Sequence, residues 1–123
     1  MKIIMYHYVR NNNDDYPNFN SLQENIFMRQ IEFFKKTNGI GSANSLLENI
    51  TSGNVDNKYY LTFDDGFKEH SRFVNDYLSE NNLTGLFFTS TKPLVKDCVL
   101  DVHKVHLLLG KYNANTLLSE AMK

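Results

Sequence analysis

The stretch YYLTFDDGF, residues 59–67, combines a strand-forming run with two adjacent carboxylates and a glycine. Aromatic and β-branched residues dominate its first half, which predicts a buried β-strand over 59–63. Two neighbouring carboxylates, Asp64 and Asp65, repel each other unless they share a proton or a cation. Gly66 then lets the backbone turn away, because it has no Cβ. Asp-Asp-Gly is also a good plain turn, but an amphipathic helix signal directly after it favours a functional site.

Strand and helix signals alternate on both sides of this stretch. Strands are predicted over 2–9, 59–63 and 83–89, and helices over 22–37, 43–51, 68–81, 102–109 and from 113 or 115 to the C-terminus. Ser21 and Glu24 have the spacing of a capping box at the start of the first helix. Lys92-Pro93 is expected to end the third strand. This alternation predicts an α/β fold with a parallel sheet and outer helices.

Composition limits the classes of function. The chain has 123 residues, 41% of them apolar and 22% charged, and a net charge of −1, as expected of one globular domain. This charge balance gives no general attraction to nucleic acid or to an anionic membrane. Cys98 is the single cysteine, so it forms no intrachain disulfide, and its apolar neighbours predict inert packing. With no signal peptide or membrane-spanning run evident, a cytoplasmic location is predicted.

The position of the two carboxylates indicates metal-dependent chemistry. Reactive residues of parallel sheets lie at the carboxyl ends of strands, where Asp64 and Asp65 are predicted. One carboxylate can bind a divalent cation while the other takes a proton from water, and the cation lowers the pKa of that water. His7 follows the first strand and is expected beside this edge. It either contacts substrate or a metal-bound water, or bonds to a backbone carbonyl.

Other side chains near these positions are predicted to be structural. His70 lies on the apolar face of the helix after Gly66, where a histidine is more often partly buried than functional. Tyr6 and Tyr8 alternate with His7 and are expected to face the opposite side of the sheet.

The string LTFDDGF resembles the first signature of the polysaccharide deacetylase family, carbohydrate esterase family four. The segments IIMYHYVR, FMRQIEFFKK and TGLFFTS stand in the order that the family uses, so the resemblance covers residues 2–91. It implies part of a (β/α) barrel that removes acetyl groups from sugar polymers with a divalent metal, often zinc. It also implies that Asp64 is the general base and Asp65 a metal ligand.

The second signature of that family, His-Ser/Thr-x-x-His, is not matched. The chain offers His103-Lys104-Val105-His106, whose histidines are three residues apart and share one helix face. Either the two histidines bind one metal ion, or one of them faces solvent while the other packs beside Leu107 and Leu109. Further family residues, including the general-acid histidine, would lie beyond residue 123.

The resemblance therefore predicts one incomplete deacetylase-like domain over 1–123, from a hydrolase of acetylated amino-sugar polymers, with little or no deacetylase activity of its own. The alternative is a non-catalytic remnant that binds carbohydrate or a partner. A phosphate-handling domain is disfavoured, because a glycine-rich phosphate loop is missing. The incomplete sheet would leave an edge unpaired, which predicts self-association.

Overall fold

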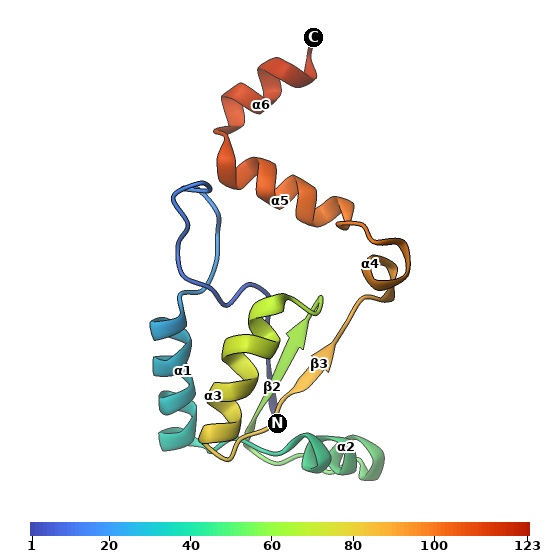
Figure 1. The fold of residues 1–123 in the computed structure, drawn as a ribbon. Coiled ribbons are helices and arrows are strands. Elements are labelled where there is room, and N and C mark those ends of the chain that lie inside the picture. The colour runs from blue at the N-terminus through green and yellow to red at the C-terminus, as the bar shows by residue number, and fades with distance from the viewer.

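A computed structural model describes residues 1–123 and has the predicted alternation of strands and helices (Figure 1). The elements are β1 (Lys2–Tyr6), α1 (Glu24–Thr37), α2 (Ala43–Ser52), β2 (Tyr59–Asp64), the π-helical η1 (His70–Val74), α3 (Asn75–Glu80), β3 (Leu86–Phe88), α4 (Thr91–Lys96), α5 (Asp101–Lys111) and α6 (Ala114–Ala121). None of these helices is both long and apolar enough to cross a membrane.

The three strands form a parallel sheet in the order β1-β2-β3, which confirms the predicted pairing. Tyr6 pairs with Phe63, so β1 and β2 end at the same edge. The first strand is shorter than predicted because the chain leaves the sheet after Tyr6, and Val9 makes only an isolated parallel bridge with Leu22. The sheet therefore presents the residues after β1 and β2 side by side.

The third strand is also shorter than predicted. The turn after α3 extends to Leu83, whose N–H donates to Leu78 O at 2.8 Å, and Asn82 has a left-handed φ of 54°. These contacts fold residues 82 and 83 into the end of the helix, so pairing with β2 begins only at Leu86.

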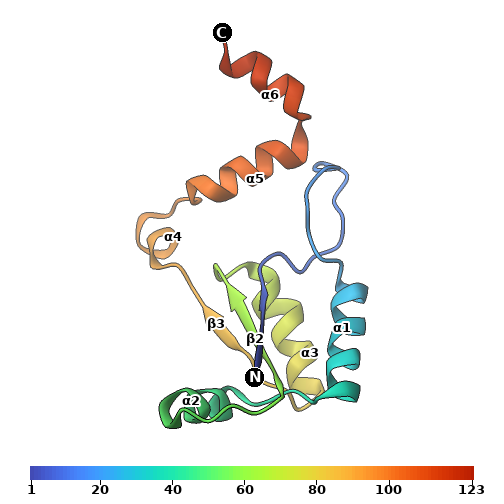
Figure 2. The same cartoon turned by 180° about the vertical axis from the view of Figure 1, so that it is seen from behind.

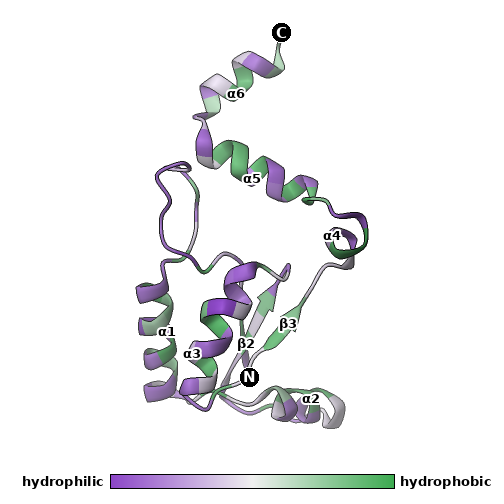
Figure 3. Ribbon diagram, in the orientation of Figure 1, coloured by the Kyte–Doolittle hydropathy of each residue, from purple (hydrophilic) through white to green (hydrophobic).

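One face of the sheet is covered by α1, η1 and α3, and the hydrophobic core lies between these layers. Phe27 and Ile31, one helical turn apart on α1, are fully buried. Apolar colour follows the side of α1 that is turned toward α3, and polar colour its outer side (Figure 3). Phe63 lies at the centre, with its ring stacked on Tyr6 at a centroid distance of 5.4 Å.

The other face of the sheet has no covering helix over β1 and β3 (Figure 2). Ile3, Met5 and Phe88 lie on it and are 51%, 61% and 56% exposed. The order β1-β2-β3 also leaves both outer strands with an unpaired edge. The sheet is therefore open, and no closed barrel is formed by these residues. Self-association through such an edge stays a prediction.

The first helix begins later than the capping box predicted. Gln23 is its N-cap residue, Ser21 instead donates its hydroxyl to Arg10 O at 3.2 Å, and Glu24 accepts from Asn11. The reason is the bridge between Val9 and Leu22, which holds the chain extended just before the helix. Tertiary pairing therefore overrides a local capping signal.

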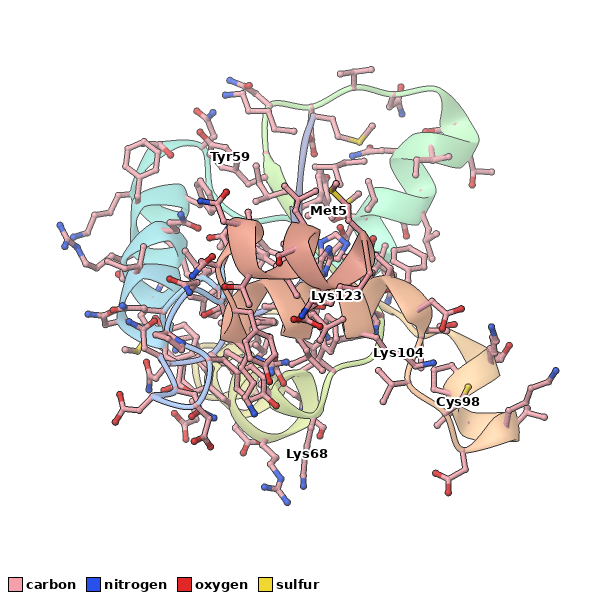
Figure 4. All side chains as sticks on the ribbon, turned by 90° about the horizontal axis from the view of Figure 1, so that it is seen from above. Met5, Tyr59, Lys68, Cys98, Lys104 and Lys123 are labelled. Atoms are coloured by element: carbon pink, nitrogen blue, oxygen red, sulfur yellow. The ribbon has the colours of Figure 1, made fainter.

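A short helix after β3 was not predicted. Pro93 is the third residue of α4, and such a position in the first turn needs no N–H donor, so proline is tolerated there. The helix ends at Asp97, which has a left-handed φ of 45°. Cys98 follows at the periphery (Figure 4), is partly exposed, and lies 3.9 Å from Lys92 O. The expectation of inert packing in apolar surroundings is therefore wrong, because Cys98 lies outside the core.

The N-termini of α5 and α6 are capped differently. Leu100 is the N-cap residue of α5 and provides no side-chain cap bond, while Asp101 lies in the first turn. Asn113 caps α6 as expected, because its side-chain oxygen accepts from Thr116 N–H at 2.9 Å.

Asp56 is expected to make the stability of the fold depend on acid pH. Its carboxylate accepts from Tyr60 O–H at 2.6 Å and from Asn49 at 3.1 Å, and these bonds hold the pKa of Asp56 below its usual range. A lowered pKa in the folded state contributes stability above the unfolded pKa of about 4, which is lost as pH falls through the folded pKa. Urea unfolding between about pH 3 and 7 should show a weaker pH dependence for Asp56→Asn than for the parent chain. The exposed Asp14→Asn is the control, and an equal pH dependence in all three proteins would contradict the prediction.

Candidate active site

Asp64 and Asp65 lie at the carboxyl end of the central strand. Asp64 is the last residue of β2 and pairs with Phe88. Asp65 and Gly66 follow with left-handed φ values of 72° and 66°. Such a φ is unfavourable for an aspartate, and residues held this way cluster at functional sites. A Cβ on residue 66 would come within 2.5 Å of Thr89 Cγ2, so glycine is required for space as well as for dihedral angle.

Two imidazoles approach the carboxylate of Asp65. His103 Nε2 from α5 lies 3.1 Å from Asp65 Oδ2, and His7 Nε2, just after β1, lies 3.8 Å from the same oxygen. His103 is 12% exposed, Asp65 28% and His7 45%, so the cluster opens toward solvent on the His7 side. The structure thus places His7 beside the carboxylates, as expected, and adds His103.

The second histidine of α5 has a different partner. His106 Nδ1 lies 3.0 Å from the hydroxyl of Tyr8. Burial raises the pKa of Tyr8, so its hydroxyl keeps its proton and can donate it to the imidazole. His103 and His106 therefore share a helix face but contact separate groups, with ring centroids 6.4 Å apart.

Tyr8 joins the aromatic residues around this cluster. Its ring lies 4.7 Å from that of Phe19 and 4.3 Å from that of Phe67, and the Arg10 guanidinium lies 5.0 Å from its centroid. The expectation that Tyr8 faces the far side of the sheet is wrong, because alternation ends with β1 at Tyr6. Tyr8 is therefore a site residue that strand periodicity hides.

An ion pair fixes the segment after β1 to the start of the helix that follows the Asp65–Gly66 turn. Arg10 Nε donates to Glu69 Oε1 at 2.6 Å, and the Glu69 side chain is only 14% exposed. The two residues are 59 positions apart, and neither has a local sequence signal for the contact. Sequence analysis could not predict this ion pair for that reason. The pair holds together the segments that carry Tyr8 and Phe67.

His70 is a buried structural histidine, as predicted, and it also supports His7. It is 3% exposed, and its Nε2 lies 2.6 Å from the backbone oxygen of His7. A carbonyl can only accept, so His70 Nε2 carries the proton and donates it. The backbone of His7 is thereby held to η1.

The donor set of the cluster can be compared with a zinc site. No group of three or more His, Cys, Asp or Glu side chains has the arrangement of a metal site in this structure. Zinc ligands lie about 2.0–2.2 Å from the ion, so two tetrahedral ligands are about 3.3 Å apart. The 3.1 Å between Asp65 Oδ2 and His103 Nε2 matches that separation, and the donor types suit zinc. This pair therefore fits two ligands of one ion, and His7 or His106 would need to move to complete three.

Gly110→Ala should destabilise the protein and displace His103. Gly110 O accepts from Asn18 N–H at 2.9 Å, and a Cβ there would lie 2.8 Å from Phe19 Cδ2 and 3.2 Å from Phe19 Cα. Alanine usually stabilises a helix by about 1 kcal/mol over glycine, but overpacking here should cost about 1–3 kcal/mol. Urea unfolding and the imidazole NMR shifts of His103 measure both effects. Lys111→Ala, at an exposed neighbouring position, is the control; a more stable Gly110→Ala protein would contradict the prediction.

Comparison with known proteins supports the fold. No protein-family model matches the sequence, and no curated protein matches it. Among solved structures, the chain is similar to a de-N-acetylase from Aggregatibacter actinomycetemcomitans, with a TM-score of 0.63 at 15% identity over 77% of this chain. The match covers 39% of that protein, so the chain spans about two fifths of its length. At this identity the likeness is one of fold, and the chain has a deacetylase-like α/β fold.

Proposed function

We propose that this chain carries the metal- and base-bearing part of a hydrolase that removes acetyl groups from amino sugars. The observation that carries the proposal is the 3.1 Å pairing of Asp65 with His103, 38 positions apart, directly beside Asp64 at the end of β2. The fold similarity to a de-N-acetylase supports the same reaction class.

Asp65 and His103 would hold a divalent metal, with zinc the best match to their donor types. The third ligand would come from His7, whose Nε2 is 3.8 Å from Asp65 Oδ2, or from His106. When bound, the ion would polarise the acetyl carbonyl and lower the pKa of a coordinated water.

The remaining residues would handle the proton and the substrate. Asp64, adjacent in sequence but not hydrogen-bonded to His103, would accept the proton from the attacking water. If His106 supplies the third metal ligand, His7, which is 45% exposed, would contact the substrate, with its backbone fixed by the bond from His70. Protonation of the leaving amine needs a general acid, and this step is separate from those of the metal and the base.

An activated ester separates these steps. The leaving group of para-nitrophenyl acetate departs without protonation, so its hydrolysis tests the metal and base alone. We expect zinc-dependent hydrolysis that falls by about hundredfold or more in Asp64→Asn, the usual size of a general-base contribution, while zinc affinity is unchanged. Asp14→Asn is the matched control. Hydrolysis that is independent of zinc, or unaffected by Asp64→Asn, would refute the proposal; zinc and sugar binding without hydrolysis would support a non-catalytic carbohydrate-binding protein.

A further inference from the structure

A cavity adjoins the candidate site on the side of His7. It measures about 600 Å³ and lies between the loop at 18–22 and α5, with His7 and His106 in its lining. Sites for small ligands usually measure about 300–1,000 Å³. His7 Nε2 lies 3.8 Å from Asp65 Oδ2, so the cavity adjoins the carboxylate cluster through His7.

The lining offers uncharged polar groups and apolar surface. The polar side chains come from Asn18, Asn20 and Ser21, and the apolar surface from Phe19, Leu22 and Leu109. Asn18 uses its backbone N–H to bond Gly110 O, which leaves its side-chain amide for a ligand. Asn20 is exposed at the rim. Amides and hydroxyls beside apolar surface suit a polyhydroxylated ring that presents both polar edges and C–H faces.

No Lys, Arg, Asp or Glu side chain lines this cavity. Lys111 follows the lining residue Gly110, but it is not part of the lining, and its ammonium lies 5.8 Å from the ring centroid of Tyr112. Arg10, two positions after Tyr8, is ion-paired with Glu69 and lies over the rings of Tyr8 and Phe67. A carboxylate on a ligand would therefore lose water without gaining an unpaired cation, which is unfavourable. An uncharged ligand has no such cost.

We propose that this cavity receives a sugar unit next to the reacting acetamido group and selects an uncharged unit over an acidic one. The proposal rests on the proposed function, because it takes the Asp65 cluster as the reacting centre. Asn18 and Asn20 bond the sugar hydroxyls, and Phe19 and Leu109 contact the ring.

Binding of two tetrasaccharides tests the selection without requiring turnover. The probes are an oligomer of N-acetylglucosamine, which is neutral, and a hyaluronan oligomer, in which N-acetylglucosamine alternates with glucuronate. We expect the Asp64→Asn chain to bind the neutral probe at least about tenfold more tightly, with amide NMR shifts concentrated at Asn18, Asn20 and Gly110. Asn20→Ala should weaken that binding, whereas Asn12→Ala, on the same loop outside the cavity, should not.

A charge introduced into the cavity should reverse the preference. Asn20→Lys gives an acidic sugar the cation it lacks and should raise affinity for the hyaluronan probe. Asn12→Lys adds the same charge to the loop outside the cavity and controls for general attraction. Equal binding of both probes, no binding of either, or equal effects of the two lysines would overturn the inference. Failure of zinc-dependent ester hydrolysis would instead overturn the proposed function, so the two are distinguishable.

Discussion

Asp65→Ala should weaken zinc binding by at least about hundredfold, because it removes the one carboxylate that both His103 and His7 approach. Loss of a group that merely supports a metal ligand typically costs 10–100-fold in affinity, and loss of a ligand should cost more. His103→Ala should have a similar effect. Competition with a chromogenic chelator at about pH 7, where imidazole is largely neutral, measures the affinities.

Alanine variants of His7 and His106 identify the third zinc ligand. If His7 is the third ligand, His7→Ala should weaken zinc binding and His106→Ala should not. If His106 is the third ligand, His106→Ala should weaken zinc binding and His7→Ala should not. Lys104→Ala, exposed on the same helix as His103, controls for changes in α5. Zinc affinity that survives both Asp65→Ala and His103→Ala would contradict a metal site here.

Phe63→Ala should lower the free energy of unfolding by about 3–5 kcal/mol, the usual cost of removing a buried phenylalanine. Phe63 is fully buried, and its ring packs on Tyr6, on Phe27 at a centroid distance of 6.1 Å and on Phe87 at 4.8 Å. Domains are stable by only about 5–15 kcal/mol, so this loss would be a large fraction of the total stability. The strand that carries Asp64 would lose its attachment to the helices.

Urea unfolding followed by circular dichroism measures this loss. Phe33→Ala is the matched control, because Phe33 is 56% exposed on the outer side of α1, and it should change stability by at most about 1 kcal/mol. Equal losses for the two variants would show that Phe63 does not hold the sheet to the helices.

The sequence predicted the sheet because its signals are local. Alternating strands and helices imply parallel pairing, and parallel pairing implies that His7 and Asp64 reach the same edge. The start of α1 was predicted wrongly because the decisive contact, between Val9 and Leu22, joins segments with no shared local pattern. Helix capping is a weak signal beside such pairing.

The site was predictable only in part, for the same reason. A strand-forming run that ends in two carboxylates and a glycine indicates Asp64 and Asp65 as site residues. The spacing of His103 and His106 puts them on one face of a helix. Nothing in that spacing says which histidine meets Asp65, because this depends on where α5 lies over the strand ends. The Tyr8 hydroxyl is 98 positions from His106, so their contact has no sequence signal.

The attachment of α5 has a consequence for how the molecule opens. This helix lies above the strand ends (Figure 1), and His103, His106 and Gly110 tie it to Asp65, Tyr8 and Asn18. Releasing it breaks these few contacts but leaves the core around β2 intact, so it should be a sub-global opening of lower free energy than unfolding. A ligand held between α5 and the strand ends would slow hydrogen exchange in α5 while exchange in β2 stays the same. Local stability at the candidate site is thus separable from the global stability of the fold.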